Sequence, residues 1–178
     1  MCKYWMQTYS GIKFCYDDPK PEMILIADIA HALSMKCRYN GHLNEFYSVA
    51  DHSVQVSELV PKPIAMHGLL HDAAEVYMAD VPRPLRKFLN NEYDKLEQEV
   101  LGVIYEAFDL KELTEEEQSI IQRADDLCLA SEADTFFDEI IDGWAFQFMG
   151  QDELITGYTE SVPKAAKERF YCRYQELV

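Results

Sequence analysis

Four side chains that can bind a metal ion or move a proton lie close together in the middle of the chain. His71 and Asp72 are adjacent, and Glu75 and Asp80 follow within eight residues of Asp72. The apolar neighbours of this His-Asp pair recur at three- and four-residue intervals, which predicts a helix packed against a core. Burying a carboxylate in such a helix is costly unless a cation pairs with it. The cluster therefore indicates a metal site.

Two more potential ligands lie on helix faces that are otherwise apolar. His52 belongs to the apolar stripe of a helix predicted over residues 48–60, and Asp125 belongs to an apolar face of a helix predicted over residues 114–137. Together with the His-Asp pair they make two imidazoles and two carboxylates from three predicted helices. This donor set suits Mn, Fe, Co, Ni or Zn, and it can leave positions open for water and a substrate oxygen.

Three sequence blocks carry these residues in a fixed order. They read FYSVADHSVQVS, LLHDAAEVYMADVPRPL and RADDLCLASEA, and the similarity described next covers about residues 22–135. The order His, His-Asp, Asp resembles that of the HD-domain metal-dependent phosphohydrolases, and the blocks are most similar to the small 5′-deoxynucleotidases and the phage-type deoxynucleoside triphosphate hydrolases of that superfamily. The resemblance implies an all-α HD-domain fold, a homo-oligomer, and one divalent metal ion per chain, with Mn, Co, Mg, Zn, Fe and Ni as candidates.

The resemblance assigns roles to individual positions of this chain. It implies that the metal ligands are His52, His71, Asp72 and Asp125. Asp126 is the adjacent alternative for the last ligand, and we prefer Asp125 because the family's acid directly follows a small residue, here Ala124. Glu75 matches the residue that positions or deprotonates the attacking water, and Asp80 matches a second catalytic acid near the leaving group or the sugar.

The resemblance also implies where the substrate binds. Arg38 matches an arginine that holds phosphate, about fifteen residues before the first histidine. Related enzymes often have tryptophan after that arginine, whereas this chain has Tyr39, so the base and sugar preference stays open. His42, in the loop that carries Arg38, and His67, one turn before His71, are further candidates for substrate contact. For His67 a packing role is the alternative.

These assignments predict a phosphohydrolase that acts on small deoxynucleotides through a metal-activated water. A 5′-deoxynucleotidase would release nucleoside and phosphate from a monophosphate. A triphosphohydrolase would release nucleoside and intact triphosphate, and it would need additional cationic contacts from Arg83, Arg86, Lys87 or a neighbouring subunit. The alternatives are a cyclic-nucleotide phosphodiesterase and a non-catalytic nucleotide sensor with the same fold.

The overall composition limits the partners. The chain has 178 residues and a formal net charge of −16, which fits one acidic domain. An acidic surface repels nucleic-acid polymers and anionic membranes, so a phosphate-bearing partner must be a small molecule held by local positive charge. No apolar run approaches membrane-spanning length, and the first residues lack the apolar core of a signal peptide. The five cysteines are odd in number and form no CxxC motif, which predicts a cytoplasmic protein with reduced thiols.

The elements that must position these residues are mostly helices. We predict a single domain, with an N-terminal extended arm over residues 1–21, a motif-bearing helical core over 22–135 and a C-terminal helical part over 136–178. The arm has aromatic residues and turn formers, consistent with a short hairpin through residues 9–11. Thr114 and Glu117 have capping-box spacing, and Pro163 begins the last helix. Helices are predicted over residues 24–35, 48–60, 63–79, 92–108, 114–137 and 163–176.

Overall fold

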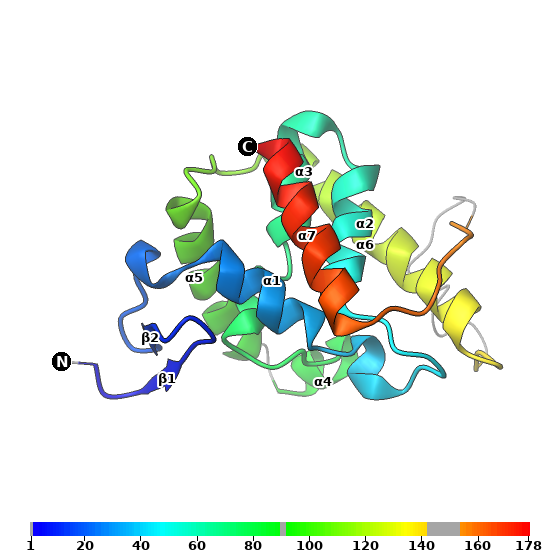
Figure 1. The fold of residues 1–178 in the computed structure, drawn as a ribbon, viewed down its shortest axis with the longest axis horizontal. Coiled ribbons are helices and arrows are strands. Elements are labelled where there is room, and N and C mark those ends of the chain that lie inside the picture. The colour runs from blue at the N-terminus through cyan, green and yellow to red at the C-terminus, as the bar shows by residue number, and fades with distance from the viewer. Residues whose placement is uncertain (1, 90–91, 142–153) are drawn as a thin grey trace.

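The computed structural model describes residues 2–89, 92–141 and 154–178. In these ranges the chain is helical apart from one short hairpin, which confirms the predicted all-α class with an N-terminal arm (Figure 1). The strands are β1 (Trp5–Gln7) and β2 (Lys13–Cys15). The α-helices are α1 (Ile26–Ser34), α2 (Val49–Leu59), α3 (Ala65–Leu70), α4 (Arg83–Phe88), α5 (Glu92–Ala107), α6 (Glu115–Phe136) and α7 (Pro163–Leu177), and the 3-10 turns are η1 (Pro21–Met23), η2 (Arg38–Gly41), η3 (Lys62–Ile64) and η4 (Ala73–Val76).

The N-terminal arm is a hairpin whose inner face joins the core. β1 and β2 are antiparallel, with Trp5 opposite Cys15, and Gly11 at the turn has a φ of +81°. Phe14 is fully buried and stacks on Tyr77 with 3.9 Å between ring centroids. The arm therefore packs directly on the segment that follows the candidate metal ligands.

The hairpin also corrects the prediction that all thiols are reduced. Cys2 and Cys15 form a disulfide with a Cα–Cα distance of 5.8 Å, whereas Cys37, Cys128 and Cys172 are free. The prediction was wrong for this pair because the hairpin, rather than a CxxC spacing, brings Cys2, which precedes β1, close to Cys15 at the end of β2.

The remaining helices enclose two buried apolar clusters in the described part of the chain, and α6 contributes to the second, with α2 and α3. α7 lies along α1, α2 and α3, and its Phe170 is fully buried among them (Figure 1). α6 begins at the predicted capping box, in which Thr114 accepts from the Glu117 backbone and the Glu117 side chain accepts from Thr114. In the described part of the chain, each helix is too short or too polar to span a membrane.

The helix predicted over residues 63–79 is wrong as one continuous helix. α3 ends at Leu70, Asp72 has φ −98° and ψ 10°, and η4 starts at Ala73. Consecutive side chains of a regular α-helix point about 100° apart. The break instead brings the Asp72 carboxylate within 3.3 Å of His71 Nε2. The irregular backbone therefore lies where two candidate ligands must converge.

A glycine lets α3 approach α2 closely. A Cβ atom at Gly68 would lie 3.0 Å from Val60 Cγ2 and 3.1 Å from the backbone Cα of Ser57. The carbonyl of Gly68 also accepts a hydrogen bond of 2.8 Å from His71 Nδ1. The absence of a side chain at this position thus sets the distance between His52 on α2 and His71 after α3.

We expect Gly68→Ala to lower the free energy of unfolding by about 1–3 kcal/mol, because the added methyl overlaps backbone atoms. Gly102→Ala is the matched control, since a Cβ there has nothing within 4 Å on α5. It should raise the free energy of unfolding by about 0.4–1 kcal/mol through helix propensity and unfolded-state entropy. Urea denaturation measures both, and wild-type stability of Gly68→Ala would contradict this account of the α2–α3 contact.

Candidate metal and catalytic site

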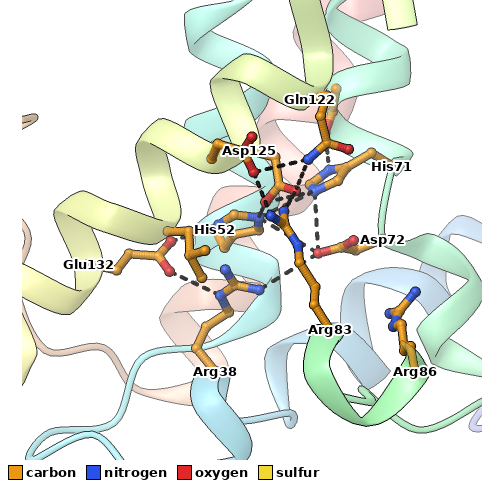
Figure 2. A network of polar contacts seen from close by, with 12 residues as sticks. Arg38, His52, His71, Asp72, Arg83, Arg86, Gln122, Asp125 and Glu132 are labelled. Carbon is orange, nitrogen blue, oxygen red and sulfur yellow. Dashed lines mark hydrogen bonds and ion pairs between the residues drawn. The ribbon is translucent and has the colours of Figure 1, made fainter. Parts of the chain in front are cut away.

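Side chains from three parts of the chain meet at one point (Figure 2). His52 comes from α2, His71 and Asp72 from the break before η4, and Asp125 from the middle of α6. His52 Nε2 lies 3.3 Å from His71 Nε2, 3.1 Å from Asp125 Oδ1 and 3.7 Å from Asp72 Oδ2. His71 Nε2 lies 3.3 Å from Asp72 Oδ2 and 4.0 Å from Asp125 Oδ1.

These separations fit the coordination shell of one cation. Ligand atoms about 2.0–2.2 Å from a metal ion lie roughly 3–4.4 Å from one another, depending on the angle between them. The donor atoms of His52, His71 and Asp72 all lie within 4.8 Å of one another. Asp125 adds an oxygen close to both imidazoles. The set therefore satisfies the spacing that a metal site requires.

The orientation of the two imidazoles supports the same conclusion. His52 Nδ1 lies 2.7 Å from a carboxylate oxygen of Glu132, and His71 Nδ1 lies 2.8 Å from the Gly68 carbonyl oxygen. Because both partners are acceptors, each Nδ1 donates a hydrogen bond, and each Nε2 is left facing the other ring. Two Nε2 atoms and two carboxylates that face one another can share a bound cation.

The electrostatics of the site also favour bound positive charge. Burial opposes protonation of His52, yet the carboxylates of Glu132 and Asp125 raise its pKa to about 9. Burial likewise opposes ionisation of Asp72 and Asp125, yet the neighbouring imidazoles hold the pKa of both carboxyls well below the usual range. The acids are therefore anionic ligands at neutral pH, in a cluster that attracts cations.

The structure distinguishes the two adjacent acids on α6. Asp125 Oδ1 faces the imidazoles, whereas Asp126 Oδ1 accepts a hydrogen bond of 2.6 Å from Arg83 Nη1. The same guanidinium donates from Nη2 to Asp125 Oδ2 at 2.5 Å, and Gln122 lies within hydrogen-bonding distance of both acids. Arg83 therefore holds the outer oxygen of Asp125 and leaves the inner oxygen towards the histidines.

The cluster opens into a pocket of about 1210 Å³. Its wall is formed by α4, α5 and α6 and by the loops around η2 and after η4. Eight of the predicted site residues line it, namely Arg38, Tyr39, His42, His71, Asp72, Glu75, Asp80 and Asp125. A pocket of this size accommodates a nucleotide beside the metal donors.

Glu75 is a buried acid, and one of its two carboxyl oxygens lacks a hydrogen-bond partner among the described residues. It lies in η4, its Oε1 is 3.8 Å from Arg86 Nη2, and its Oε2 has no hydrogen-bond partner in the described part of the chain. Burial, reinforced by the charges of Asp72 and Asp80, raises the pKa of Glu75 well above its usual range. Such a carboxyl accepts a proton readily near neutral pH, as a general base must. Half-buried Asp80 lines the same pocket.

Arg38 and Tyr39 form one side of the pocket. Arg38 is buried, donates from Nε to Glu132 at 3.0 Å, and places Nη1 3.9 Å from Asp72 Oδ2. Tyr39 has a positive φ of 53°, and its hydroxyl donates to the Leu129 carbonyl on α6. The left-handed turn at η2 thus puts a guanidinium and an aromatic ring beside the metal donors.

The two remaining histidine candidates differ in position. His42 is exposed, and its backbone N–H donates to the Tyr39 carbonyl at the pocket rim. His67 is buried outside the pocket lining, where its Nε2 contacts the Lys111 carbonyl and its ring packs edge-on to Tyr105. His67 therefore lies outside the pocket lining, in a position that fits the packing alternative.

Two residues hold the candidate ligands in place, a role not predicted from the sequence for either of them. Glu132 contacts His52 and Arg38, and Arg83 contacts Asp125. Glu132 lies two helical turns after Asp125 on the same face of α6, and this spacing of two acids is the signal in the sequence. Arg83 gives no such signal, since its partners lie more than forty residues away.

No family model matches the chain. It is 41% identical over 128 residues to YfdR of Escherichia coli K12, described as uncharacterized, over 72% of this chain and 70% of YfdR. It is 32% identical over 119 residues to an uncharacterized protein of Rhodobacter capsulatus, over 62% of this chain and 61% of that protein.

A more distant similarity links the chain to proteins named for an activity. It is 30% identical over 120 residues to a 5′-deoxynucleotidase of Vibrio atlanticus, over 58% of this chain and 54% of that protein. The chain thus spans about half the length of the 5′-deoxynucleotidases it matches. With 41% identity across most of both sequences, the chain belongs to the same family as YfdR, a family with distant relatives among the proteins named 5′-deoxynucleotidases.

Proposed function

We propose that this chain is a metal-dependent phosphohydrolase of the HD-domain superfamily that removes phosphate from small deoxynucleoside monophosphates. The observation that carries the proposal is the convergence of His52, His71, Asp72 and Asp125 at ligand spacing beside a buried, unpaired carboxyl oxygen of Glu75. The distant 5′-deoxynucleotidases support the substrate class. We also propose that the enzyme is homo-oligomeric, as the resemblance implies, and cytoplasmic, with the Cys2–Cys15 disulfide as an exception to the reduced thiols expected in that compartment.

The donor set defines what a bound cation contributes. A divalent ion held by two imidazoles and two carboxylates would act as a Lewis acid that lowers the pKa of water and offsets the charge of phosphate. Arg38 supplies the protein's own positive charge at this wall of the pocket. Its planar fork suits two phosphate oxygens, and its burial limits the entropy lost when it binds them.

Glu75 and Asp80, the two pocket acids with proposed catalytic roles, act on opposite sides of the reaction. Glu75, with its raised pKa and unpaired Oε2, accepts the proton of the attacking water. Asp80 lines the same pocket and assists the leaving nucleoside oxygen. A non-catalytic sensor needs neither of these acids, so their presence in the pocket favours an enzyme.

The charge of the pocket favours a monophosphate over a triphosphate. The described lining residues include three arginines and seven acidic side chains. Each arginine already pairs with acids: Arg38 with Glu132, Arg83 with Asp125 and Asp126, and Arg86 with Glu97. A triphosphate brings more negative charge, so its binding would require these pairs to be broken. One phosphate needs only the metal ion and Arg38.

Product analysis tests the proposed reaction directly. With Mn²⁺ or Co²⁺, a panel of deoxynucleoside mono- and triphosphates should yield nucleoside and inorganic phosphate from the monophosphates, and a chelator should abolish turnover. Release of intact triphosphate would contradict the choice of substrate. Failure to consume any nucleotide in the metal-loaded state would contradict the enzymatic proposal.

Asp125→Asn and Asp126→Asn form a matched pair for the fourth ligand. Loss of the Asp125 charge should weaken Mn²⁺ binding by more than about 100-fold, because an anionic ligand is lost. Loss of the Asp126 charge should weaken it by less than about tenfold, since Asp126 acts only through Arg83. Calorimetric titration with Mn²⁺ measures both effects. The reverse ranking would assign the ligand to Asp126.

Glu75→Gln removes the proposed base while keeping its shape. We expect kcat to fall by about 10²–10⁴-fold, because general base catalysis contributes on that order. Mn²⁺ affinity should stay within about twofold of wild type, since Glu75 is not a proposed ligand. Glu99→Gln, an exposed position on α5, is the control. Wild-type turnover by metal-loaded Glu75→Gln would refute the role.

A further inference from the structure

Glu132 is a charged side chain shielded from water and shared between two functional groups. It lies on α6 and is completely buried. Its Oε1 is 2.7 Å from His52 Nδ1, and its Oε2 is 3.0 Å from Arg38 Nε. A buried carboxylate is costly unless both oxygens have partners, and here each oxygen has one. Figure 2 shows the carboxylate lying beside the His52 ring and the Arg38 guanidinium.

The contact with His52 fixes how that ring presents its metal-binding nitrogen. Because a carboxylate only accepts, His52 Nδ1 must donate, and Nε2 is left for a cation. The same contact sets the rotation of the ring, which points Nε2 at His71 and Asp125. A carboxylate behind a ligand imidazole also makes the ligand more basic.

The contact with Arg38 fixes how the guanidinium faces the pocket. The Arg38 Nε–H group, at the base of the guanidinium, donates to Glu132, and the Arg38 Nη1 atom extends towards Asp72. The terminal nitrogens are thereby directed to the side where the metal donors lie. Since Arg38 lines the pocket and is buried, its position depends on contacts within the protein rather than on solvent, and its contact with Glu132 is shorter than its contact with Asp72.

We propose that Glu132 is a positioning residue that sets the metal ligand His52 and the phosphate-binding Arg38 together, so that metal affinity and phosphate affinity depend on the same carboxylate. The inference rests on the proposed function, because it takes His52 and Arg38 in those roles. It goes further in coupling the two binding events through one side chain that touches neither metal nor substrate.

Glu132→Gln tests the shared role with little change of shape. The amide keeps one acceptor oxygen but turns an N–H₂ group towards the second donor, so His52 and Arg38 cannot both be satisfied. We expect the Kd for Mn²⁺ alone to rise about 10–100-fold. The Kd for inorganic phosphate on the Mn²⁺-loaded protein should rise about tenfold, since Arg38 loses its orientation.

Asp134→Asn is the matched control, because it makes the same charge change at an exposed position two residues later on α6. Its two dissociation constants should stay within about twofold of wild type. A folded Glu132→Gln variant with wild-type constants for both ligands would overturn the positioning role. If the wild-type protein itself binds no Mn²⁺ and consumes no nucleotide, the proposed function fails instead.

A measurement on the wild-type chain covers the case in which Glu132→Gln does not fold. Nitrogen-15 NMR of the Zn²⁺-loaded protein should show the metal on His52 Nε2 and a hydrogen-bonded proton on Nδ1. Coordination through Nδ1, or a proton on Nε2, would overturn the inference, because Glu132 could then not be the acceptor that orients the ring.

Discussion

The candidate site holds four electron-pair donors at distances where they repel one another unless a cation lies between them. His52 and His71 face each other through their Nε2 atoms, with one carboxylate close to each ring. Although burial opposes protonation, the surrounding carboxylates raise the pKa of both histidines, so without a metal ion the site favours protonated imidazoles. A divalent ion would replace these protons, because the groups that repel one another would become its ligands. The stability of the site and its chemistry therefore have the same origin.

The surrounding structure supplies the rigidity that this arrangement needs. Gly68 allows α2 and α3 to approach, and its carbonyl orients His71. The end of α3 brings Asp72 to the side of His71, and Arg83 from α4 holds the outer oxygen of Asp125. On the far side, Glu132 links a ligand to the pocket wall. His52, His71 and Asp125 thus each have a second contact that fixes their orientation.

Residue type and period were enough to predict the helical class and the capping box at Thr114, and they singled out His52 and Asp125 as polar residues on apolar helix faces. A histidine and an aspartate are unusual on apolar helix faces, so residue type alone singles out His52 and Asp125, regardless of where their helices lie in the fold. The break after Leu70, the Cys2–Cys15 disulfide and the role of Arg83 were not predictable in this way. They depend on strand register and on contacts between distant segments, which local periodicity does not encode.

The central claim is that four side chains from three parts of the chain hold one divalent cation. The most direct measurement is an anomalous difference map from crystals grown with Mn²⁺. We expect one strong peak at coordination distance from the Nε2 atoms of His52 and His71 and from a carboxylate oxygen of each of Asp72 and Asp125. A map without a peak among these atoms under saturating Mn²⁺, or with the ion bound elsewhere in the pocket, would contradict it.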